Sequence, residues 1–281
     1  MNTNIINGTN ILKLIQNKIK KYIKKKNYYR KPIIAVINIG NNEPSKIYIY
    51  EKKKACYKSN IQLILFNLKE HINQKTCLDL VKKLNKDKFV DGILIQLPLP
   101  NKIKINEISK LIKFKKDIDG FHPYNFGKLA IGYKSIIPCT CLSVLKILKG
   151  IKTTFNSLCV VIVGSSNIVG KPIALELISM GATVIICNKY TRNIKFYVRL
   201  ADILIIAIGK ANFISNEWVK RKTIIIDIGI NRLSNGKVVG DFYLTGNFKD
   251  FSIITSVPGG VGPLTIAALL QNTFDSYLCN I

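Results

Sequence analysis

The stretch VVIVGSSNIVGKPIALEL, residues 160–177, decides the fold because it joins an apolar run, a glycine-containing turn and a helical pattern. The β-branched run over 157–164 predicts a buried parallel strand, and residues 171–181 have helical spacing. In this order the first N–H groups of the helix face the turn and can bind a phosphate. We therefore predict the first βα unit of a nucleotide-binding sheet; a tight turn that binds nothing is the alternative.

The glycines of this turn match the dinucleotide fingerprint GxGxxG only in part. Gly164 occupies the first position, Ser166 and Val169 stand at the next two, and Gly170 comes one residue late. The fingerprint alone is therefore a weak signal, and the next strand has to be considered with it.

The strand predicted over 183–188 ends without the Asp or Glu that binds the ribose 2′-hydroxyl in NAD-preferring sites. It is followed by Lys189, Thr191 and Arg192, which suit a 2′-phosphate. NADP is therefore favoured over NAD as the cofactor.

Strand and helix patterns alternate on both sides of the opening stretch. Before it, strands are expected at 31–40, 61–68 and 90–100, and helices at 11–29, 43–58, 73–86 and 104–114. After it, strands are expected at 183–188, 202–209, 223–230 and 252–263, and helices at 193–201, 216–221 and 264–279. Such alternation predicts an α/β fold of two doubly wound units, each with a parallel sheet covered on both faces.

Residues 117–133, DIDGFHPYNFGKLAIGY, interrupt this alternation with Gly, Pro, Asn and aromatic residues. We place a hinge region at 121–137, one domain at 1–120 together with 264–281, and a second domain at 138–263. Ligands of such sheets bind beyond the carboxyl ends of the strands. Two units that face each other would therefore form one active-site cleft.

The charge of the chain is strongly positive, with 43 Lys and Arg against 16 Asp and Glu among 281 residues and a formal net charge of +27. Only five of these cations are arginine, the residue that nucleic-acid readers favour for bidentate and stacked contacts. We interpret the excess as solvated surface lysine and expect no nucleic-acid partner. A basic nucleic-acid-binding protein remains a remote alternative.

The seven cysteines include no CxxC pair, and Cys139 and Cys141 have no nearby His or Cys with which to bind a metal. We expect reduced thiols in a cytoplasmic protein without a metal site. No run of about 18 uncharged apolar residues occurs, so no membrane span is expected.

Several segments together resemble the bifunctional methylenetetrahydrofolate dehydrogenase/methenyltetrahydrofolate cyclohydrolase family. They are YIYEKKKAC, DGILIQLPLP, KDIDGFHPYNFG, VGSSNIVGKP, DIGINR with GKVVGD, and VPGGVGPLT, and they extend in order over nearly the whole chain. The resemblance implies an N-terminal folate-binding domain, to which the C-terminal helix returns, and a Rossmann NADP-binding domain.

The same resemblance implies an activity in one-carbon metabolism and purine biosynthesis. The enzyme would oxidise 5,10-methylenetetrahydrofolate with NADP and hydrolyse the resulting 5,10-methenyltetrahydrofolate to 10-formyltetrahydrofolate. It would be a homodimer formed through the nucleotide domains. A dehydrogenase without cyclohydrolase activity is the alternative within this fold.

By resemblance, the catalytic residues are Tyr48, Lys52, Gln96 and Asp119. The chemistry requires a lysine that is uncharged for part of the cycle, because the oxidised substrate is itself a cation. Tyr48 and Lys52 are spaced i and i+4, so they share a helix face, whereas Lys53 and Lys54 point elsewhere. Gln96 can hydrogen-bond the amine, and Asp119 can accept two hydrogen bonds from the pterin.

The remaining predicted contacts also come from the resemblance. Substrate binding involves the four catalytic residues together with Leu97, Pro98, Pro258, Gly259, Gly260, Val261 and Thr265. Cofactor binding involves Gly164, Ser165, Ser166, Ile168, Val169, Asn188, Lys189, Thr191 and Ile230.

The chain departs from the family pattern in the loop PCTCLS, where Cys141 and Ser143 stand in place of Pro and Gly. It also carries Ser165 and Asn188 where many relatives have Arg and His.

Overall fold

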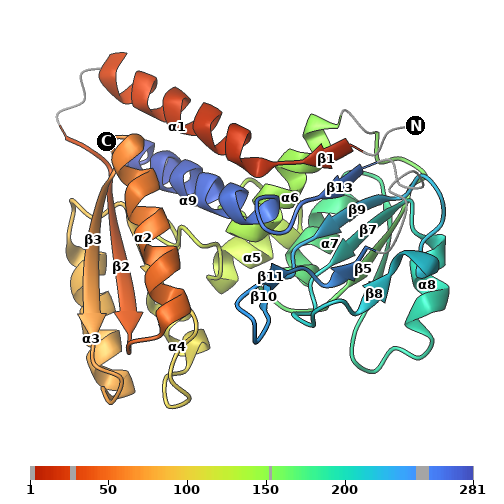
Figure 1. Ribbon diagram of the computed structural model, residues 1–281. Coiled ribbons are helices and arrows are strands. Elements are labelled where there is room, and N and C mark those ends of the chain that lie inside the picture. Colours follow the sequence, from red (N-terminus) through yellow and green to blue (C-terminus); the bar gives the residue numbers. More distant parts are fainter. Residues whose placement is uncertain (1–3, 26–29, 152–153, 245–252, 281) are drawn as a thin grey trace. The chain divides into compact units, whose positions relative to one another are not determined.

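The computed structural model describes residues 4–25, 30–151, 154–244 and 253–280 (Figure 1). The chain divides into two compact units. The three-stranded unit comprises Leu12–Lys128, Lys134–Cys139 and Ile266–Ile281, and the six-stranded unit comprises the rest. Each unit is built on one parallel sheet, which confirms the predicted α/β class.

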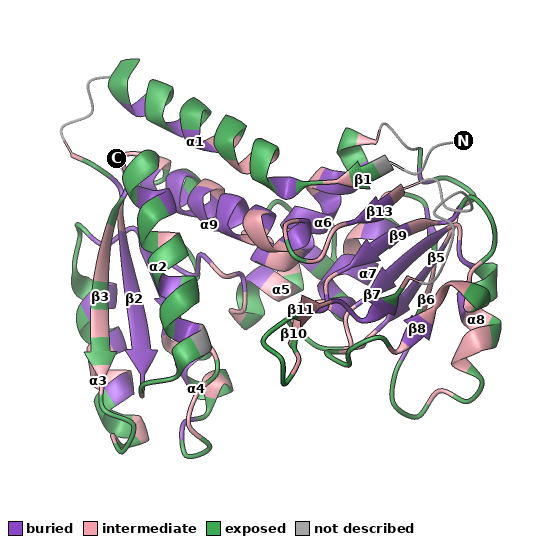
Figure 2. Ribbon diagram, in the orientation of Figure 1, coloured by how far each residue is buried: buried purple, intermediate pink, exposed green. Residues whose placement is uncertain are grey.

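The three-stranded sheet has the order β3-β2-β4, with β2 (Ile33–Ile39) in the centre, β3 (Gln62–Leu68) and β4 (Gly92–Ile95). Its helices are α1 (Gly8–Lys25), α2 (Glu43–Lys58), α3 (Gln74–Lys86) and α4 (Ile105–Leu111). Six of the seven β2 residues are buried, as expected of a central strand covered on both faces (Figure 2). The strand predicted over 90–100 is shorter than expected, because β4 ends at Ile95 before the prolines at 98 and 100.

Asparagine side chains cap the starts of α2 and α3 in this unit. Asn42 Oδ1 accepts from the N–H of Ser45 at 3.1 Å, and Asn73 Oδ1 accepts from the N–H of Thr76 at 2.8 Å. Each contact satisfies one of the N–H groups that a helix leaves unpaired at its start. The start of α2 is therefore encoded locally by Asn42, six residues before Tyr48.

The six-stranded sheet has the order β1-β13-β9-β7-β5-β6, and all of its neighbours are parallel. Its strands are β1 (Asn4–Ile6), β5 (Cys159–Val163), β6 (Thr183–Cys187), β7 (Ile203–Ile206), β9 (Ile224–Asp227) and β13 (Ile253–Thr255). The helices α7 (Gly170–Ser179) and α8 (Ile194–Leu200) follow β5 and β6. Because β6 and β7 flank β5 on opposite sides, the strand order reverses at the end of β5.

Two short strand pairs complete this unit. The hairpin of β10 (Asn231–Arg232) and β11 (Val238–Val239) is antiparallel, whereas β8 (Ile214–Ser215) and β12 (Phe242–Tyr243) are parallel. Residues 216–221 were predicted to form a short helix, but only a 3₁₀ turn at Asn216–Trp218 is present.

The amino-terminal strand differs from the predicted domain boundary. Residues 1–120 were assigned to one domain, but β1 pairs in parallel with β13 and lies at the edge of the six-stranded sheet. Only three residues form this strand, so no periodic pattern could reveal it. The predicted helix at 11–29 begins earlier, at Gly8, and its last four positions lie outside the described residues.

The segment predicted as a hinge, 121–137, is not irregular throughout. Pro123–Ala130 form the helix α5, and the following helix α6 begins at Cys139 and ends at Gly150. The PCTCLS stretch, predicted to be a loop, is therefore mostly helical, and both Cys141 and Ser143 are fully buried in it. Whether the segment acts as a hinge stays a prediction.

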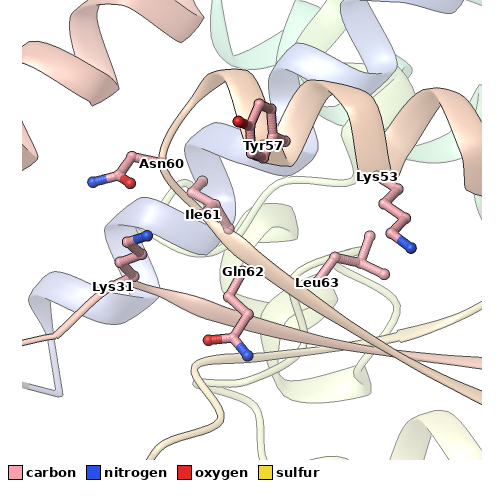
Figure 3. A pocket seen from close by; sticks show the side chains of 7 residues that line it. All are labelled: Lys31, Lys53, Tyr57, Asn60, Ile61, Gln62 and Leu63. Carbon is pink, nitrogen blue, oxygen red and sulfur yellow. The ribbon is translucent and has the colours of Figure 1, made fainter.

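Two hollows in the three-stranded unit lie where β2 and β3 begin. Figure 3 shows the first, with a volume of about 280 Å³, and the side chains that line it, among them Lys31, Lys53 and Tyr57. The second, about 570 Å³, shares Lys31 and Tyr57 with it. None of the four predicted catalytic residues lines either hollow. Because ligands of parallel sheets bind at the opposite, carboxyl ends of the strands, we do not place the substrate in either hollow.

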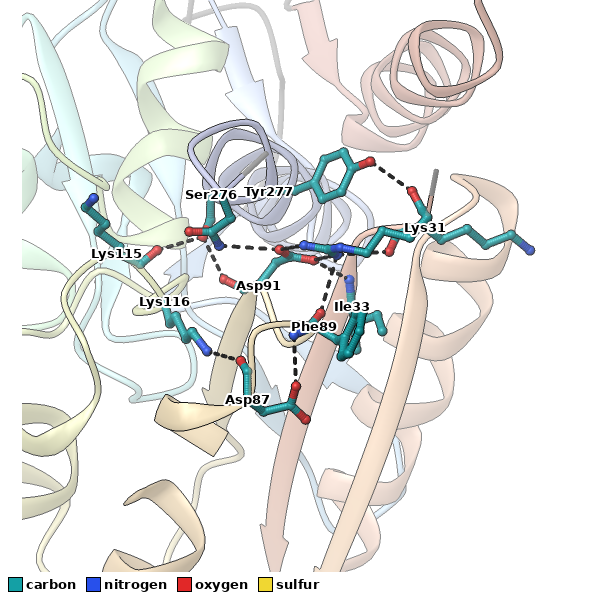
Figure 4. A network of polar contacts seen from close by, with 11 residues as sticks. Lys31, Ile33, Asp87, Phe89, Asp91, Lys115, Lys116, Ser276 and Tyr277 are labelled. Atoms are coloured by element: carbon teal, nitrogen blue, oxygen red, sulfur yellow. Dashed lines mark hydrogen bonds and ion pairs between the residues drawn. The ribbon is translucent and has the colours of Figure 1, made fainter. Parts of the chain in front are cut away.

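The C-terminal helix α9 (Val261–Leu278) belongs to the three-stranded unit from Ile266 onward and is joined to it by a buried carboxylate (Figure 4). Asp91, whose side chain is fully buried, accepts two hydrogen bonds from the Arg30 guanidinium at 2.7 and 2.8 Å. Ser276 donates to the Asp91 carbonyl at 2.6 Å, and the Tyr277 hydroxyl donates to the Arg30 carbonyl at 2.8 Å. The sheet and the last helix thus share one polar network.

Replacement of Asp91 by alanine should destabilise the fold strongly. The change leaves the partly buried Arg30 guanidinium without its carboxylate, which costs about 3 kcal/mol in comparable sites. Chemical denaturation at equilibrium measures the free energy of unfolding. The matched control is Asp79→Ala, because Asp79 pairs with Lys82 at 3.1 Å on an exposed helix face. This control should lose no more than about 1 kcal/mol, and an equal loss in both variants would contradict the importance of the buried pair.

Candidate functional site

One face of helix α2 carries Tyr48 and Lys52, two of the predicted catalytic residues. Tyr48 has 38% of its surface exposed, Lys52 is partly buried, and Cys56 is 1% exposed, whereas Lys53 and Lys54 are exposed. Burial raises the pKa of the Tyr48 phenol, so the hydroxyl stays protonated at neutral pH. The helical spacing therefore separates one partly buried lysine from its exposed neighbours, as the sequence predicts.

The amine of Lys52 is oriented by a neighbouring strand end. Lys52 Nζ donates to Gln96 Oε1 at 2.9 Å, which is the contact that the sequence predicts. Gln96 is 6% exposed, and its Nε2 donates to the carbonyl of Leu97 at 2.7 Å. The Ser45 hydroxyl donates to the same carbonyl at 3.3 Å. The turn after β4 is thereby joined to the start of α2, and the Gln96 oxygen faces the amine.

Asp119 lies within the electrostatic field of Lys52. Burial raises the pKa of the Asp119 carboxyl to about 6; the charge of Lys52 opposes the shift, the charge of Asp117 adds to it, and a hydrogen bond from Cys139 opposes it. Asp119 is therefore ionised at neutral pH and becomes protonated in mildly acidic solution. The three-stranded unit thus contains all four predicted catalytic residues, with a hydrogen bond or a charge interaction linking Lys52, Gln96 and Asp119.

The carboxylate of the neighbouring Asp117 accepts hydrogen bonds mainly from backbone N–H groups. Its carboxylate accepts from the N–H groups of Phe121 and His122 at 3.1 and 2.8 Å and from Asn125 Nδ2 at 2.9 Å. These contacts shape the turn that follows Asp119 and the start of α5. Asp117 is therefore a structural residue, whereas no backbone N–H among the described residues donates to the Asp119 carboxylate.

The turn after β5 brings backbone close to backbone in the six-stranded unit. A Cβ atom on Gly164 would lie 2.3 Å from the Ala207 carbonyl oxygen, and a Cβ on Gly170 would lie 1.8 Å from the Gly164 oxygen. Ser166 Oγ accepts from the N–H of Val169 at 3.1 Å and closes the turn ahead of α7. Ser165 is half-buried and Ile168 is 38% exposed. Such a cradle at a helix N-terminus, where the strand order reverses, fits the pyrophosphate of a dinucleotide.

The residues after β6 form a compact turn that leaves its cations exposed. The Asn188 N–H donates to Thr191 Oγ1 at 2.9 Å, and the Tyr190 N–H donates to Asn188 Oδ1 at 2.9 Å. Asn188 and Thr191 therefore shape the turn. Lys189, over the Tyr190 ring at 4.9 Å, and Arg192 are the exposed charges available to a 2′-phosphate.

Sequence reasoning missed a buried carboxylate pair at the ends of β7 and β9. Asp241 Oδ2 accepts from the N–H groups of Ile208 and Gly209 at 2.7 and 2.9 Å. Asp227 Oδ1 accepts from the N–H groups of Gly229 and Asp241 at 2.9 and 3.1 Å. Burial raises the pKa of Asp227 to about 6, three backbone N–H groups oppose the shift, and the charge of Asp241 adds to it.

These two aspartates hold the turns from which Ile208 and Ile230 project, and Ile230 is 49% exposed. Asp227 lies in the segment DIGINR, and Asp241 lies in the segment GKVVGD. The occurrence of both segments in one chain was the sequence signal that could have revealed the pair.

The glycine-rich segment PGGVGPLT is held by the amino-terminal part of the same unit. The Gly8 N–H donates to the Gly259 carbonyl at 2.8 Å, and a Cβ on Gly8 would lie 2.1 Å from the Gly260 oxygen. Thr265 donates its hydroxyl to the Gly262 carbonyl at 2.6 Å, and Pro258 is exposed while Val261 is buried. Gly8 is a third residue that sequence reasoning missed, since a lone glycine carries no pattern.

Family models match nearly the whole chain. The tetrahydrofolate dehydrogenase/cyclohydrolase catalytic domain matches residues 6–119, and the NAD(P)-binding domain of the same enzymes matches residues 138–280. This chain belongs to the tetrahydrofolate dehydrogenase/cyclohydrolase family. The family assignment agrees with the resemblance that the sequence motifs indicate.

Individual members of the family are similar over most of their length. The bifunctional protein FolD of Buchnera aphidicola is 48% identical over 248 residues, 87% of each chain. The crystal structure of the Campylobacter jejuni FolD dehydrogenase/cyclohydrolase superposes with a TM-score of 0.95 at 40% identity, covering 99% of this chain and 100% of that one. The Trypanosoma brucei FolD structure, complexed with NADP and an inhibitor, has a TM-score of 0.94 at 30% identity, covering 99% and 98%.

Within the described part of the tetrahydrofolate dehydrogenase/cyclohydrolase chain, no helix is long and apolar enough to span a membrane.

Proposed function

We propose that this protein is a bifunctional folate enzyme with NADP as its cofactor. It oxidises 5,10-methylenetetrahydrofolate to the 5,10-methenyl cation while NADP⁺ becomes NADPH. It then adds water to the cation, which yields 10-formyltetrahydrofolate and one proton. The observation that carries this proposal is the hydrogen bond between Lys52 Nζ and Gln96 Oε1 at 2.9 Å, in the field of the Asp119 carboxylate.

Lys52 is the proton-transfer residue of the hydrolytic step. Water attacks the cationic carbon, and its proton must leave while a ring nitrogen of the adduct gains one. A neutral amine can take the first proton and return it to the nitrogen. Gln96 accepts one N–H of this amine, so the remaining positions of the nitrogen stay available to the substrate. Tyr48, one helical turn away, supplies a protonated hydroxyl on the same face.

Asp119 binds the pterin rather than moving a proton. Its carboxylate, when ionised, offers two acceptors to the two N–H groups on the amino-pyrimidine edge. Leu97 and Pro98 after β4, and Pro258, Gly259, Gly260, Val261 and Thr265 in the glycine-rich segment, complete the proposed substrate contacts.

NADP supplies the hydride acceptor when it is bound. The Gly164–Gly170 cradle, with Ser165, Ser166, Ile168 and Val169, would hold its pyrophosphate. Lys189 and Arg192, on the turn shaped by Asn188 and Thr191, would bind the 2′-phosphate, and Ile230 would contact the dinucleotide. The fit is supported by the two close backbone approaches at the glycines and by the absence of an acid in the turn over 188–192.

The Lys52→Met variant should lose cyclohydrolase activity by about 100-fold or more, the usual contribution of a proton-transfer group. Dehydrogenase activity should fall less, because hydride transfer does not require the amine as a base. Both rates are measured spectrophotometrically on the same preparation. Lys53→Met is the matched control, since Lys53 is the exposed neighbour on α2 and should keep both activities. Wild-type hydrolysis by Lys52→Met would refute the proposed role.

The KM for methylenetetrahydrofolate should rise as the pH falls through about 6. Below that pH Asp119 is protonated and presents an O–H to substrate N–H groups, so it accepts less well. Steady-state kinetics between about pH 5 and pH 8 test this, with Asp119→Asn as the comparison. The variant should have a raised KM without this pH dependence. A wild-type KM that is flat across the range would contradict the assignment.

Joint replacement of Lys189 and Arg192 by alanine should raise the KM for NADP by about tenfold, equivalent to about 1.4 kcal/mol of lost charge-assisted binding. The KM for NAD should change little, because NAD lacks the 2′-phosphate. Lys237→Ala, which removes another exposed lysine of the same unit, is the control. A wild-type preference for NAD would contradict the cofactor proposal outright.

We also propose a homodimer formed through the six-stranded units. β6 is an edge strand with Ile186 39% exposed, and Ile178 and Phe196 on the helices that flank it are 56% and 54% exposed. An apolar edge of this kind favours pairing with a second copy. Sedimentation velocity should give a dimer for the wild type and a monomer for Ile186→Lys, and a monomeric wild type would contradict the proposal.

We place the protein in the cytoplasm and in purine biosynthesis. All seven cysteines are free thiols, as in a reducing compartment, and 10-formyltetrahydrofolate is a formyl donor for purines. Cell fractionation and a purine requirement on depletion test the two statements.

A further inference from the structure

The thiol of Cys139 lies beside the carboxyl group of Asp119. Cys139 is the first residue of α6 and is 7% exposed. Its Sγ donates to the Ile118 carbonyl at 3.4 Å, and its side chain is also hydrogen-bonded to the Asp119 carboxylate. Because a thiol has a single hydrogen, these two acceptors compete for one donor.

An amide from the C-terminal helix makes this competition possible without leaving a buried group unpaired. Asn272 Nδ2 donates to the carbonyls of Ile118 and Ile137 at 2.9 and 3.0 Å and lies 3.7 Å from Cys139 Sγ. The Ile118 carbonyl therefore keeps a donor when the thiol turns toward Asp119. Asn272 is itself 4% exposed, so its position is set by packing.

The charges around the pair keep the thiol protonated. Burial and the nearby Asp119 carboxylate raise the pKa of Cys139 well above its usual range. The titratable groups that face the pair are Lys52 from α2 and Asp117 from the preceding turn, while α9 contributes the neutral Asn272. Cys139 is therefore an S–H donor throughout the range in which Asp119 titrates, and not a nucleophile.

We propose that Cys139 is a positioning residue for Asp119: its S–H donates to the carboxylate when Asp119 is ionised and to the Ile118 carbonyl when Asp119 is protonated. That this matters for folate binding rests on the function proposed above for Asp119. A thiol is a weak donor, so it stabilises the carboxylate only slightly and leaves the pKa of Asp119 at about 6.

The test compares Cys139→Ser, which keeps a stronger donor, with Cys139→Ala, which removes the donor. Carbon-13 NMR of the Asp119 carboxyl, assigned with the Asp119→Asn variant, gives its pKa directly. Relative to wild type, the pKa of Asp119 should rise in Cys139→Ala and fall in Cys139→Ser, by roughly half a unit to one unit each. Cys77→Ala is the matched control, because Cys77 is also buried but lies in the apolar core of the three-stranded sheet. It should leave the pKa of Asp119 unchanged.

An unchanged pKa in Cys139→Ala, or a shift in the same direction in both variants, overturns the proposal. If Cys139→Ala does not fold, Cys139→Ser decides alone, since a merely structural role predicts no downward shift. The KM for methylenetetrahydrofolate is measured against pH on the same variants. The pH below which the KM rises should shift together with the Asp119 pKa measured by NMR. If the two variants shift the pKa of Asp119 as expected while the KM does not depend on pH, the thiol contact is confirmed. In that case the substrate role of Asp119 fails instead.

Discussion

The buried carboxylate of Asp91 is the contact on which the three-stranded unit depends. It binds the Arg30 guanidinium and the Ile33 N–H, so it fixes the start of β2 against the start of β4. From there the register places Gln96 beside Ile37, where the Gln96 N–H donates to the Ile37 carbonyl at 2.9 Å. The same carboxylate accepts from Asn280, and its backbone carbonyl accepts from Ser276, so the last helix is fixed too. A single buried carboxylate therefore orders both the strand that precedes Gln96 and the helix that supplies Asn272.

The six-stranded unit is constrained instead by close approaches of backbone to backbone. Gly164, Gly170 and Gly8 each occupy a position where a Cβ would overlap a carbonyl oxygen. Asp227 and Asp241 hold the neighbouring turns by accepting backbone N–H groups that the ends of the strands leave unpaired. Glycines and buried carboxylates thus have different roles at the carboxyl ends of the strands. The glycines let backbone segments approach each other closely, and the carboxylates fix the neighbouring turns.

Most of the regular elements could be predicted because their signals are local. Apolar β-branched runs marked β2, β5 and β9, and the i, i+4 spacing of Tyr48 and Lys52 placed them on one helix face. The pairing of Lys52 with Gln96 was expected from the family resemblance, which the hydrogen bond at 2.9 Å matches. The short strand β1 and the helical start at Cys139 were not predicted, because their contacts are with residues far away in the sequence. The helix α5 was not predicted either, because its Gly, Pro and Asn residues are typical of a loop.

The sequence by itself determined the α/β class, the family and the glycine turn, and it gave the proposal of Tyr48, Lys52, Gln96 and Asp119 as catalytic residues. These features depend on residue types and on their spacing along the chain. Only the tertiary structure decided that Asp119 carries a raised pKa beside Cys139, that Asp117 serves the backbone, and that Asp227 and Asp241 form a buried pair. The reason is that burial and hydrogen-bond partners depend on residues far apart in the sequence, as Asn272 and Ile118 are, and no local pattern encodes such pairs.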